Sequence, residues 1–198
     1  MGFYDRHILP RVIDVAMRQQ RLEPYRRRVL AGAEGRVLEI GVGSGPNLPF
    51  YPKQATEILG LEPHTKLQAM AARAGVQVVP GSAEAIPLDR ASVDTVVTTW
   101  TLCSISGIEA ALVEMRRVLR PGGKLLFVEH GLAPDAGVQK WQHRLTPMWK
   151  GIAGGCHLDR DIPALIRAAG FEIVQMDTGH MPGPRPMTFM YEGWARPL

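Results

Sequence analysis

Short apolar segments alternate with longer segments of helical periodicity along most of the chain. The apolar segments are rich in β-branched residues, and their hydrophobic positions run on without alternating polar ones. Strands of this kind are buried on both faces, as in a parallel sheet that lies between helices. The predicted strands cover 36–43, 56–63, 76–81, 93–100, 124–131, 171–177 and 187–195.

Helices are predicted between several of these strands because apolar residues recur there about every 3.6 positions. They cover 65–75, 108–123 and 160–170, and they end at Gly75, at the Pro121-Gly122-Gly123 turn and at Gly170. Glycine and proline commonly end helices in this way. The alternation predicts an α/β class with a Rossmann-like doubly wound sheet that carries helices on both faces.

Two segments do not follow this alternation, although the whole of 1–198 is predicted to form a single domain. Residues 1–34 include an amphipathic helix, expected over 5–22, which would cover the ligand crevice at the carboxyl ends of the strands, with a capping helix that makes no substrate contact as the alternative. Residues 132–159 form a long connection rich in Trp, Met, Pro and Gly, with a helix expected around 136–146. A connection of this length in a compact domain is usually functional, so we expect a substrate lid.

Composition narrows the class of protein. The net charge is +4, and arginines concentrate near the N-terminus between Arg18 and Arg28. No nucleic-acid motif accompanies them, so this basic segment is expected to be a solvated helix face, with a lid or a peripheral membrane contact as the alternatives. The chain has two cysteines, no apolar run long enough for a membrane span and no signal-peptide pattern. We therefore expect a cytoplasmic protein.

A glycine-rich turn follows the first predicted strand and reads Glu39-x-Gly41-x-Gly43-x-Gly45. Glycines at such a turn allow the backbone to approach a ligand closely. The spacing differs from the G-x-G-x-x-G of dinucleotide loops, which argues against an NAD(P) oxidoreductase. An acidic Glu39 would repel a pyrophosphate but tolerate an ammonium or a sulfonium. The loop therefore favours a cationic cofactor.

Further candidate cofactor ligands follow the next strands, where open α/β sheets place their ligands. Glu62 ends the second predicted strand, and its two oxygens could accept hydrogen bonds from both ribose hydroxyls. Ser82, Ala83 and Glu84 could line an adenine pocket, although a solvent-facing position is favoured for Glu84. The remaining candidates for the cofactor site are Asn47, Pro63, Thr99 and Leu102.

As a set, EIGVGSG, Glu62, GSAEAIPL and MRRVLRPGGKLLFVEH resemble the class I S-adenosylmethionine (SAM)-dependent methyltransferases of the ubiquinone/menaquinone-biosynthesis branch. The resemblance covers roughly 35–197. It implies a seven-stranded sheet with an antiparallel last strand, and SAM as the cofactor. It also implies that Glu39 and the glycines hold the methionine end of SAM and that Glu62 binds the ribose. Many relatives have Asp where Ser82 stands, so adenine recognition differs here.

Within that class, NLPFYP, TLCSI, RRVLRPGGKLLFVEHG and GGCHLDRD are similar to the methyltransferase-like thiol S-methyltransferases. Those proteins carry an N-terminal hydrophobic anchor, which is not seen in this sequence. We expect methyl transfer to a small lipophilic acceptor, with a thiol as the first candidate. A quinone precursor or a phospholipid head group is the alternative acceptor, and a non-catalytic SAM-binding protein is the alternative of another class.

The acceptor end of the site is less defined by sequence. His130 follows the fifth predicted strand and is the candidate catalytic base, because an imidazole takes up a proton near neutral pH. Packing or capping roles are open alternatives for every candidate at this end. The candidate substrate-binding residues are Tyr4, Cys103, Trp141, His143 and Trp149.

The segment GGCHLDRD (154–161) places Cys156 beside His157. Neighbours on a chain seldom face one another, and no second ligand pair lies at zinc-like spacing, so we expect no metal site. Asp159 is predicted to be the N-cap of the helix that follows, with Asp161 in its first turn. The segment is interpreted as a hinge, with a wall of the acceptor pocket as the alternative.

Overall fold

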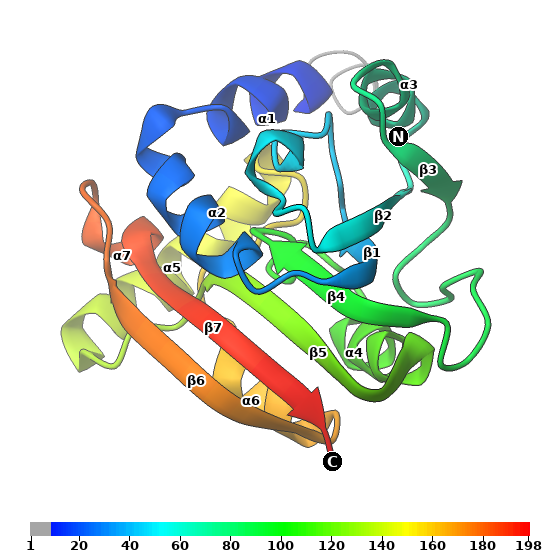
Figure 1. The fold of residues 1–198 in the computed structure, drawn as a ribbon. Coiled ribbons are helices and arrows are strands. Elements are labelled where there is room, and N and C mark those ends of the chain that lie inside the picture. Colours follow the sequence, from blue (N-terminus) through cyan, green and yellow to red (C-terminus); the bar gives the residue numbers. More distant parts are fainter. Residues whose placement is uncertain (1–8) are drawn as a thin grey trace.

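Seven strands form one sheet in the order β3-β2-β1-β4-β5-β7-β6 (Figure 1). The computed structural model describes residues 9–198, so Tyr4 lies outside the described residues. The strands are β1 (Gly35–Ile40), β2 (Ala55–Glu62), β3 (Gln77–Pro80), β4 (Val93–Thr99), β5 (Leu119–His130), β6 (Phe171–His180) and β7 (Phe189–Pro197). The strands β1 to β5 run parallel, and β7 runs antiparallel to both β5 and β6. The predicted fold class is confirmed.

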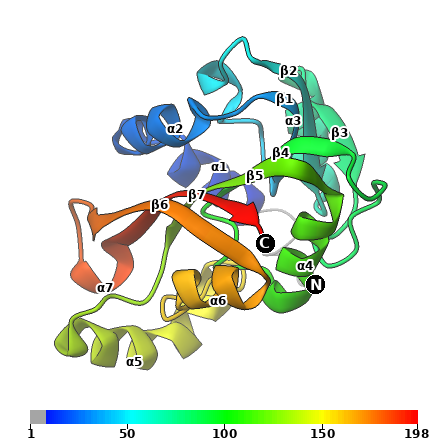
Figure 2. The same cartoon turned by 60° about the horizontal axis from the view of Figure 1, so that its bottom comes forward.

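Helices cover both faces of this sheet (Figure 2). They are α1 (Leu9–Met17), α2 (Glu23–Leu30), α3 (Thr65–Arg73), α4 (Ile108–Val118), α5 (Ala136–Ile152), α6 (Ile162–Ala168) and the short α7 (Arg185–Thr188). Successive side chains of a strand point to opposite faces. In β5, Phe127 packs in the core shared with α4 and α6, whereas Leu126 and Val128 pack in the core shared with α2. This alternation explains the continuous apolar runs of the strands.

The predicted positions of the helices are right, but several ends differ. The helix expected over 5–22 ends at Met17 in the described part, and α2 begins at Glu23 with Pro24 in its first turn. The fixed φ of proline suits a helix start and disfavours its interior, so the segment divides into two helices. The helix expected around 136–146 continues as α5 to Ile152, past Pro147.

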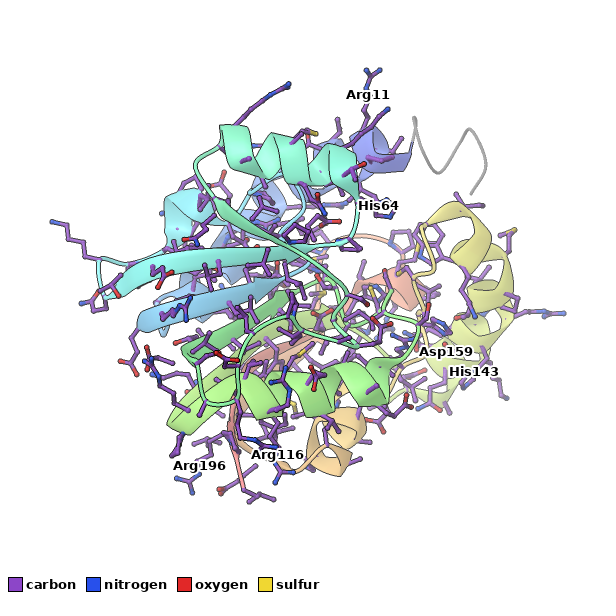
Figure 3. All side chains as sticks on the ribbon, turned by 90° about the vertical axis from the view of Figure 1, so that its right-hand side faces the viewer. Arg11, His64, Arg116, His143, Asp159 and Arg196 are labelled. Atoms are coloured by element: carbon purple, nitrogen blue, oxygen red, sulfur yellow. The ribbon has the colours of Figure 1, made fainter. Side chains whose placement is uncertain are left out.

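Two further boundaries follow from tertiary contacts. The α4 helix ends at Val118, before the Pro121-Gly122-Gly123 turn, because Leu119 already pairs with Val93 of β4. The N-cap of α6 is Asp161, whose carboxylate accepts a hydrogen bond from the backbone N–H of Ala164 at 3.0 Å. The prediction of Asp159 as the cap is wrong, since Asp159 instead pairs with His143 of α5 at 3.0 Å (Figure 3).

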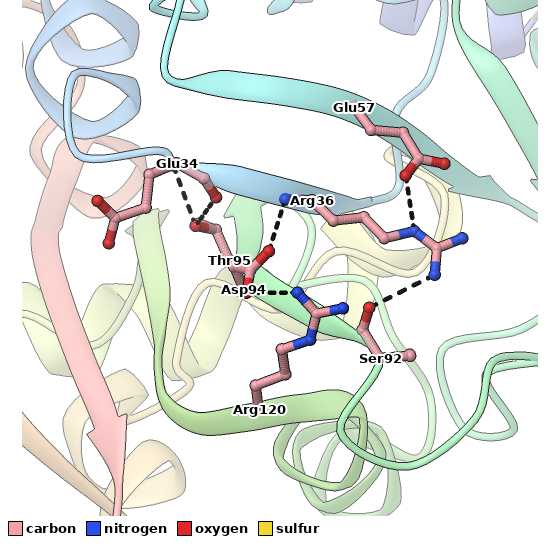
Figure 4. Close-up of polar contacts among 7 residues, drawn as sticks. All are labelled: Glu34, Arg36, Glu57, Ser92, Asp94, Thr95 and Arg120. Atoms are coloured by element: carbon pink, nitrogen blue, oxygen red, sulfur yellow. Dashed lines mark hydrogen bonds and ion pairs between the residues drawn. The ribbon is translucent and has the colours of Figure 1, made fainter.

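Ion pairs join the strands at the edge of the sheet where β1, β2 and β4 begin (Figure 4). The Arg36 guanidinium lies 2.9 Å from the carboxylate of Glu57, and the Arg36 backbone N–H donates to Asp94 at 2.8 Å. Asp94 also accepts from Arg120 at 2.7 Å. These side chains neutralise one another, which leaves the opposite, carboxyl edge of the sheet as the place for a ligand.

No helix within 9–198 is both long and apolar enough to cross a bilayer.

Candidate active site

A cavity of about 480 Å³ lies where β1, β2, β4 and β5 end. Its lining combines the glycine-rich turn, the loops after β2, β3 and β4, the end of β5 and residues of α1. A cavity of this size suits a small organic ligand. The predicted site residues that line it are Glu39, Gly41, Gly43, Glu62, Pro63, Ser82, Ala83, Glu84, Thr99, Cys103 and His130.

The turn after β1 depends on glycine for two reasons. Gly41 has φ +67°, and a Cβ there would lie 2.6 Å from the Cγ2 of Thr101. Both the conformation and the contact exclude a larger residue. Gly45 also has a positive φ but does not line the cavity; it shapes the turn from behind, against Leu48.

Glu62 holds the same turn from the end of β2. One of its carboxylate oxygens accepts from the backbone N–H of Gly43 at 3.0 Å, and the other accepts from His64 at 2.9 Å. Burial raises the pKa of Glu62, although both backbone hydrogen bonds act in the opposite direction. Each carboxylate oxygen can accept a further hydrogen bond, so Glu62 remains able to bind hydroxyl groups in the cavity.

Glu39 is the more deeply buried carboxyl of the cavity, with 1% of its surface exposed. Its two oxygens accept from the side-chain amide of Asn47 and from the hydroxyl of Tyr51, both at 2.8 Å. Burial raises the pKa of Glu39 to about 7 despite these donors. A cationic ligand in the cavity would stabilise the ionised form of this carboxyl group.

Asn47 does not line the cavity but connects several of its residues. Its amide also donates to the Thr99 hydroxyl at 3.0 Å, and its carbonyl accepts from the guanidinium of Arg26. Arg26 further donates to the carbonyl of Met17 at 2.6 Å and lies 4.9 Å from the centre of the Trp100 ring. Burial lowers the pKa of Arg26 to about 10.

Arg26 and Trp100 are functional-site residues that sequence reasoning missed. Arg26 belongs to the basic segment interpreted as a solvated face, yet only 2% of it is exposed. Its spacing from Leu22, Val29 and Leu30 on the apolar face of α2 was the available signal. Trp100 lines the cavity with φ +52°, which is rare for a bulky side chain and typical of functional sites. No sequence pattern indicates that conformation.

The loop after β3 contributes Ser82, Ala83 and Glu84 to the cavity wall. The Ser82 hydroxyl donates to the Glu84 carboxylate, and Glu84 also accepts from the backbone N–H of Gly107 at 3.2 Å. Glu84 therefore fastens this loop to the start of α4. Leu102 is a core residue and not part of the lining, and its carbonyl accepts from Arg160.

Three side chains that are distant in sequence meet at one end of the cavity. The Nε2 of His130 lies 3.0 Å from the Sγ of Cys156, and both atoms lie within 4.8 Å of the Sγ of Cys103. The segment 154–161, interpreted as a hinge, thus also forms part of the cavity wall through Gly154 and Cys156. The expectation that Cys156 and His157 do not face one another holds, because Cys156 faces His130 instead.

The protonation of this cluster is shared among its members. Hydrogen bonding from Cys156 and the nearby imidazole lower the pKa of Cys103, whereas hydrogen bonding to Cys103 and burial raise the pKa of Cys156. Burial alone would lower the pKa of His130. The effects of Cys103 and Glu129 raise it by more than burial lowers it, so the pKa of His130 is raised overall. Burial and Cys103 raise the pKa of the enclosed Glu129 to about 8.

The candidate substrate residues of α5 do not line the cavity. Trp141 is exposed and stacks with Arg144, and His143 pairs with Asp159 at the surface (Figure 3). Trp149 is half-buried, and its indole N–H lies near enough to Cys156 to lower the pKa of that thiol. The lining comes instead from α1, through Ile13, Asp14, Ala16 and Met17.

Comparison with known proteins agrees with this geometry. Residues 38–127 match a family model described as a methyltransferase domain. Human thiol S-methyltransferase TMT1A is 32% identical over an alignment of 167 positions that covers 78% of this chain and 67% of that protein. Human thiol S-methyltransferase TMT1B is 37% identical over an alignment of 161 positions that covers 75% of this chain and 65% of that protein. The chain thus spans about two thirds of the length of these relatives.

A solved structure extends the likeness to the fold. The SAM-dependent methyltransferase, possible histamine N-methyltransferase, of Thermotoga maritima is 25% identical with a TM-score of 0.69, covering 96% of this chain and 97% of that one. The sheet order and the cavity at its carboxyl edge define a Rossmann-like nucleotide-binding enzyme class. Together with the sequence matches, they show that the chain belongs to the class I SAM-dependent methyltransferases.

Proposed function

We propose that this protein transfers a methyl group from SAM to the sulfur of a small lipophilic thiol. The observation that carries the proposal is one cavity with two chemically different ends. Buried carboxylates and the glycine turn line one end, and two thiols with an imidazole line the other. The similarity to thiol S-methyltransferases supports the choice of acceptor.

The residues at the first end fit SAM. Gly41 and Gly43 bring the backbone to the cavity surface, and Glu39 provides a buried negative charge for the cationic methionine end. Glu62 keeps acceptor capacity at the end of β2, where a ribose would lie. When bound, SAM supplies an electrophilic methyl group. The chain has to orient the two reactants and exclude water.

The second end fits a nonpolar acceptor with a reactive sulfur. Ile105 and Ala153, which are near Cys103 and Cys156 in sequence, and Ile13 and Met17 of α1 contribute apolar surface to the same cavity. Such walls favour a lipophilic molecule and disfavour water. A thiol loses its proton more readily than a phenol or a protonated amine does. A thiol acceptor therefore needs the least activation by the protein.

A turnover screen tests the proposal. Purified protein would be incubated with SAM and a panel of alkyl thiols, the matching alcohols, phenols, quinols, amines and phosphatidylethanolamine vesicles, and S-adenosylhomocysteine release would be measured. We expect release with thiols and little with the matching alcohols. Preference for a quinol or a lipid would overturn the thiol assignment. If no acceptor in the panel caused release, only SAM binding would remain.

The variant Glu62→Ala is the matched control for this screen. Loss of the hydrogen bonds to the ribose should weaken SAM binding by tenfold or more, on the order of 1.5–3 kcal/mol for a charged acceptor. Calorimetric titration measures this affinity directly. Unchanged SAM affinity would refute the position of the ribose, whichever acceptor is methylated.

A further inference from the structure

Cys103, His130 and Cys156 form a cluster of three metal-binding side chains that the sequence does not show. They come from the loop after β4, the end of β5 and the loop after α5, and their ligand atoms all lie within 4.8 Å of one another. All three line the cavity. A cluster with one side open to a ligand cavity differs from a closed structural site.

The distances fit a zinc ion with small adjustments. At tetrahedral angles, zinc bonds of about 2.3 Å to sulfur and 2.0–2.1 Å to nitrogen separate the ligand atoms by roughly 3.6–3.8 Å. The present 3.0 Å between His130 Nε2 and Cys156 Sγ would have to widen by about half an ångström. Side-chain rotation provides such a movement. Thiolate and imidazole ligands together also favour zinc over magnesium or calcium.

The surroundings of the cluster supply the support that metal ligands need. The buried indole N–H of Trp149 has no well-formed hydrogen bond and lies close to the Cys156 sulfur, where it would donate to a thiolate. One oxygen of the buried Glu129 carboxyl, next to His130 in sequence, also has no hydrogen-bond partner. A dication nearby would compensate this enclosed carboxylate.

The three ligands are also held in place by backbone contacts. The backbone N–H of His157 donates to the carbonyl of Cys103 at 2.9 Å, which joins the two cysteine-bearing loops. Arg160 donates to the carbonyls of Leu102 and Ile105, on either side of Cys103. The cluster is therefore largely preorganised, as a metal site in a folded enzyme should be.

We propose that Cys103, His130 and Cys156 bind one Zn²⁺ ion whose fourth position is open to the cavity and accepts the sulfur of the methyl acceptor. The part that concerns the acceptor rests on the proposed function. In this arrangement His130 is a zinc ligand, and loss of the acceptor's proton is driven by the metal, so the predicted role of His130 as general base is not needed.

The step balances without a further reactant. The acceptor thiol binds zinc as a thiolate and releases its proton to water. An electron pair of that thiolate sulfur forms the new bond to the methyl carbon, and the bond between this carbon and the sulfonium breaks, leaving its pair on the departing sulfur. The products are a neutral thioether and S-adenosylhomocysteine. A thioether is a much weaker zinc ligand than a thiolate, so the product leaves.

Metal binding can be tested without turnover. The full chain would be kept reduced with a phosphine, stripped of metal and titrated with Zn²⁺ or Co²⁺. We expect one ion per chain and, with Co²⁺, a thiolate-to-cobalt charge-transfer band together with the intense visible bands of tetrahedral coordination. Cys103→Ser and Cys156→Ser should each weaken binding by at least about a hundredfold, since even outer partners of metal ligands contribute 10–100-fold.

His157→Gln is the matched control, because His157 is adjacent to Cys156 in sequence but is not one of the three proposed ligands. Among the described residues, its imidazole forms an ion pair with Asp159. This variant should leave the metal affinity unchanged. Binding of S-adenosylhomocysteine and the circular dichroism spectrum report whether each cysteine variant folds. Absence of stoichiometric metal in the reduced protein, or equal affinity in a folded cysteine variant, would overturn the proposal.

The acceptor part has its own readout. Adding an alkyl thiol to the cobalt form should strengthen the charge-transfer band, and the corresponding alcohol should not. An unchanged spectrum at saturating thiol would overturn this part. Full-rate thiol methylation by metal-free protein would overturn the zinc proposal and leave the proposed function standing. Thiol ligation to cobalt with no methylation of any acceptor would do the reverse.

Discussion

Glu39 shows how a single buried carboxyl can report on ligand binding. It is enclosed by Asn47 and Tyr51, which donate to it, and Arg26 is the nearby cation. Because burial raises the pKa of Glu39 to about 7, much of this carboxyl is protonated at pH 6.5. A sulfonium or ammonium group in the cavity would favour the ionised form and lower that pKa.

The sign of the pH effect follows from this linkage. SAM binding should therefore release a proton when the pH lies below the pKa of Glu39 in the free protein, so SAM affinity should rise as the pH increases toward about 7 and level off above it. Calorimetry at pH 6.5 in two buffers of different ionisation enthalpy measures the released proton. Glu39→Gln should remove both the release and the slope. The same proton release in wild type and Glu39→Gln would exclude Glu39 as its source.

The sequence predicted a residue's presence in the candidate site when that residue ends a strand of the sheet. Glu39 and Glu62 stand at the ends of parallel strands, and strand ends meet at one edge of the sheet whatever the loops do. Cys156 and Arg26 had no such anchor. Cys156 lines the cavity because the loop after α5 packs against the ends of β4 and β5. That contact joins residues distant in sequence, and local sequence patterns do not predict it.

The N-terminal helices are the element that most changes the sequence-based picture. A basic amphipathic segment was expected to cover the ligand crevice or only to cap the sheet, and its arginines were assigned to solvent, to a lid or to a membrane surface. In the structure α2 packs on β5 and β7, and α1 lines the cavity. The spacing of Arg26 from Leu22, Val29 and Leu30 places it among the apolar positions, but periodicity does not show that it is a buried hydrogen-bond donor.

Arg26 and Arg27 form a matched pair for testing this attachment. Arg26→Ala would leave the carbonyls of Asn47 and Met17 without their donor in a buried place and should lower the free energy of unfolding by about 2–4 kcal/mol. Arg27 is exposed and pairs with Glu23 at 3.6 Å, so Arg27→Ala should change it by less than about 1 kcal/mol. Urea unfolding measures both. Similar losses in the two variants would contradict the role of Arg26.

Strand and helix positions were predictable at the scale of elements, and their ends were not. Pairing decided the end of α4, because Leu119 belongs to β5. Asp161 rather than Asp159 is the N-cap of α6, and the carboxylate of Asp159 instead pairs with His143 of the preceding helix, α5. Such choices depend on neighbours that only the folded chain brings together.

The whole molecule divides between the two edges of its sheet. Ion pairs among Arg36, Glu57, Asp94 and Arg120 close the amino edge, and every cavity-lining segment gathers at the carboxyl edge. The carboxyl edge is covered by two segments that are far apart in the sequence. These are α1 and the loop 153–156 that follows α5.

This arrangement predicts how ligand binding should spread through the molecule. The α1 helix is joined to the glycine turn through Ser44, which contacts Asp14 and accepts from Arg18 at 3.0 Å, while Val12 and Val15 on its outer side are exposed. A helix with so few buried contacts should open often in the free protein. A ligand that fills the cavity should hold it closed, because four residues of α1 line that cavity.

Hydrogen exchange with and without S-adenosylhomocysteine measures this closure. We expect exchange to slow by about tenfold or more in α1, in the glycine turn and at 153–156, because opening of these segments becomes coupled to ligand release. Strand β6 lies at the far edge of the sheet and should exchange at the same rate in both states. The Glu62→Ala variant at the same ligand concentration should show no such protection. Slowing confined to the glycine turn would mean that α1 is a fixed cap that does not respond to the ligand.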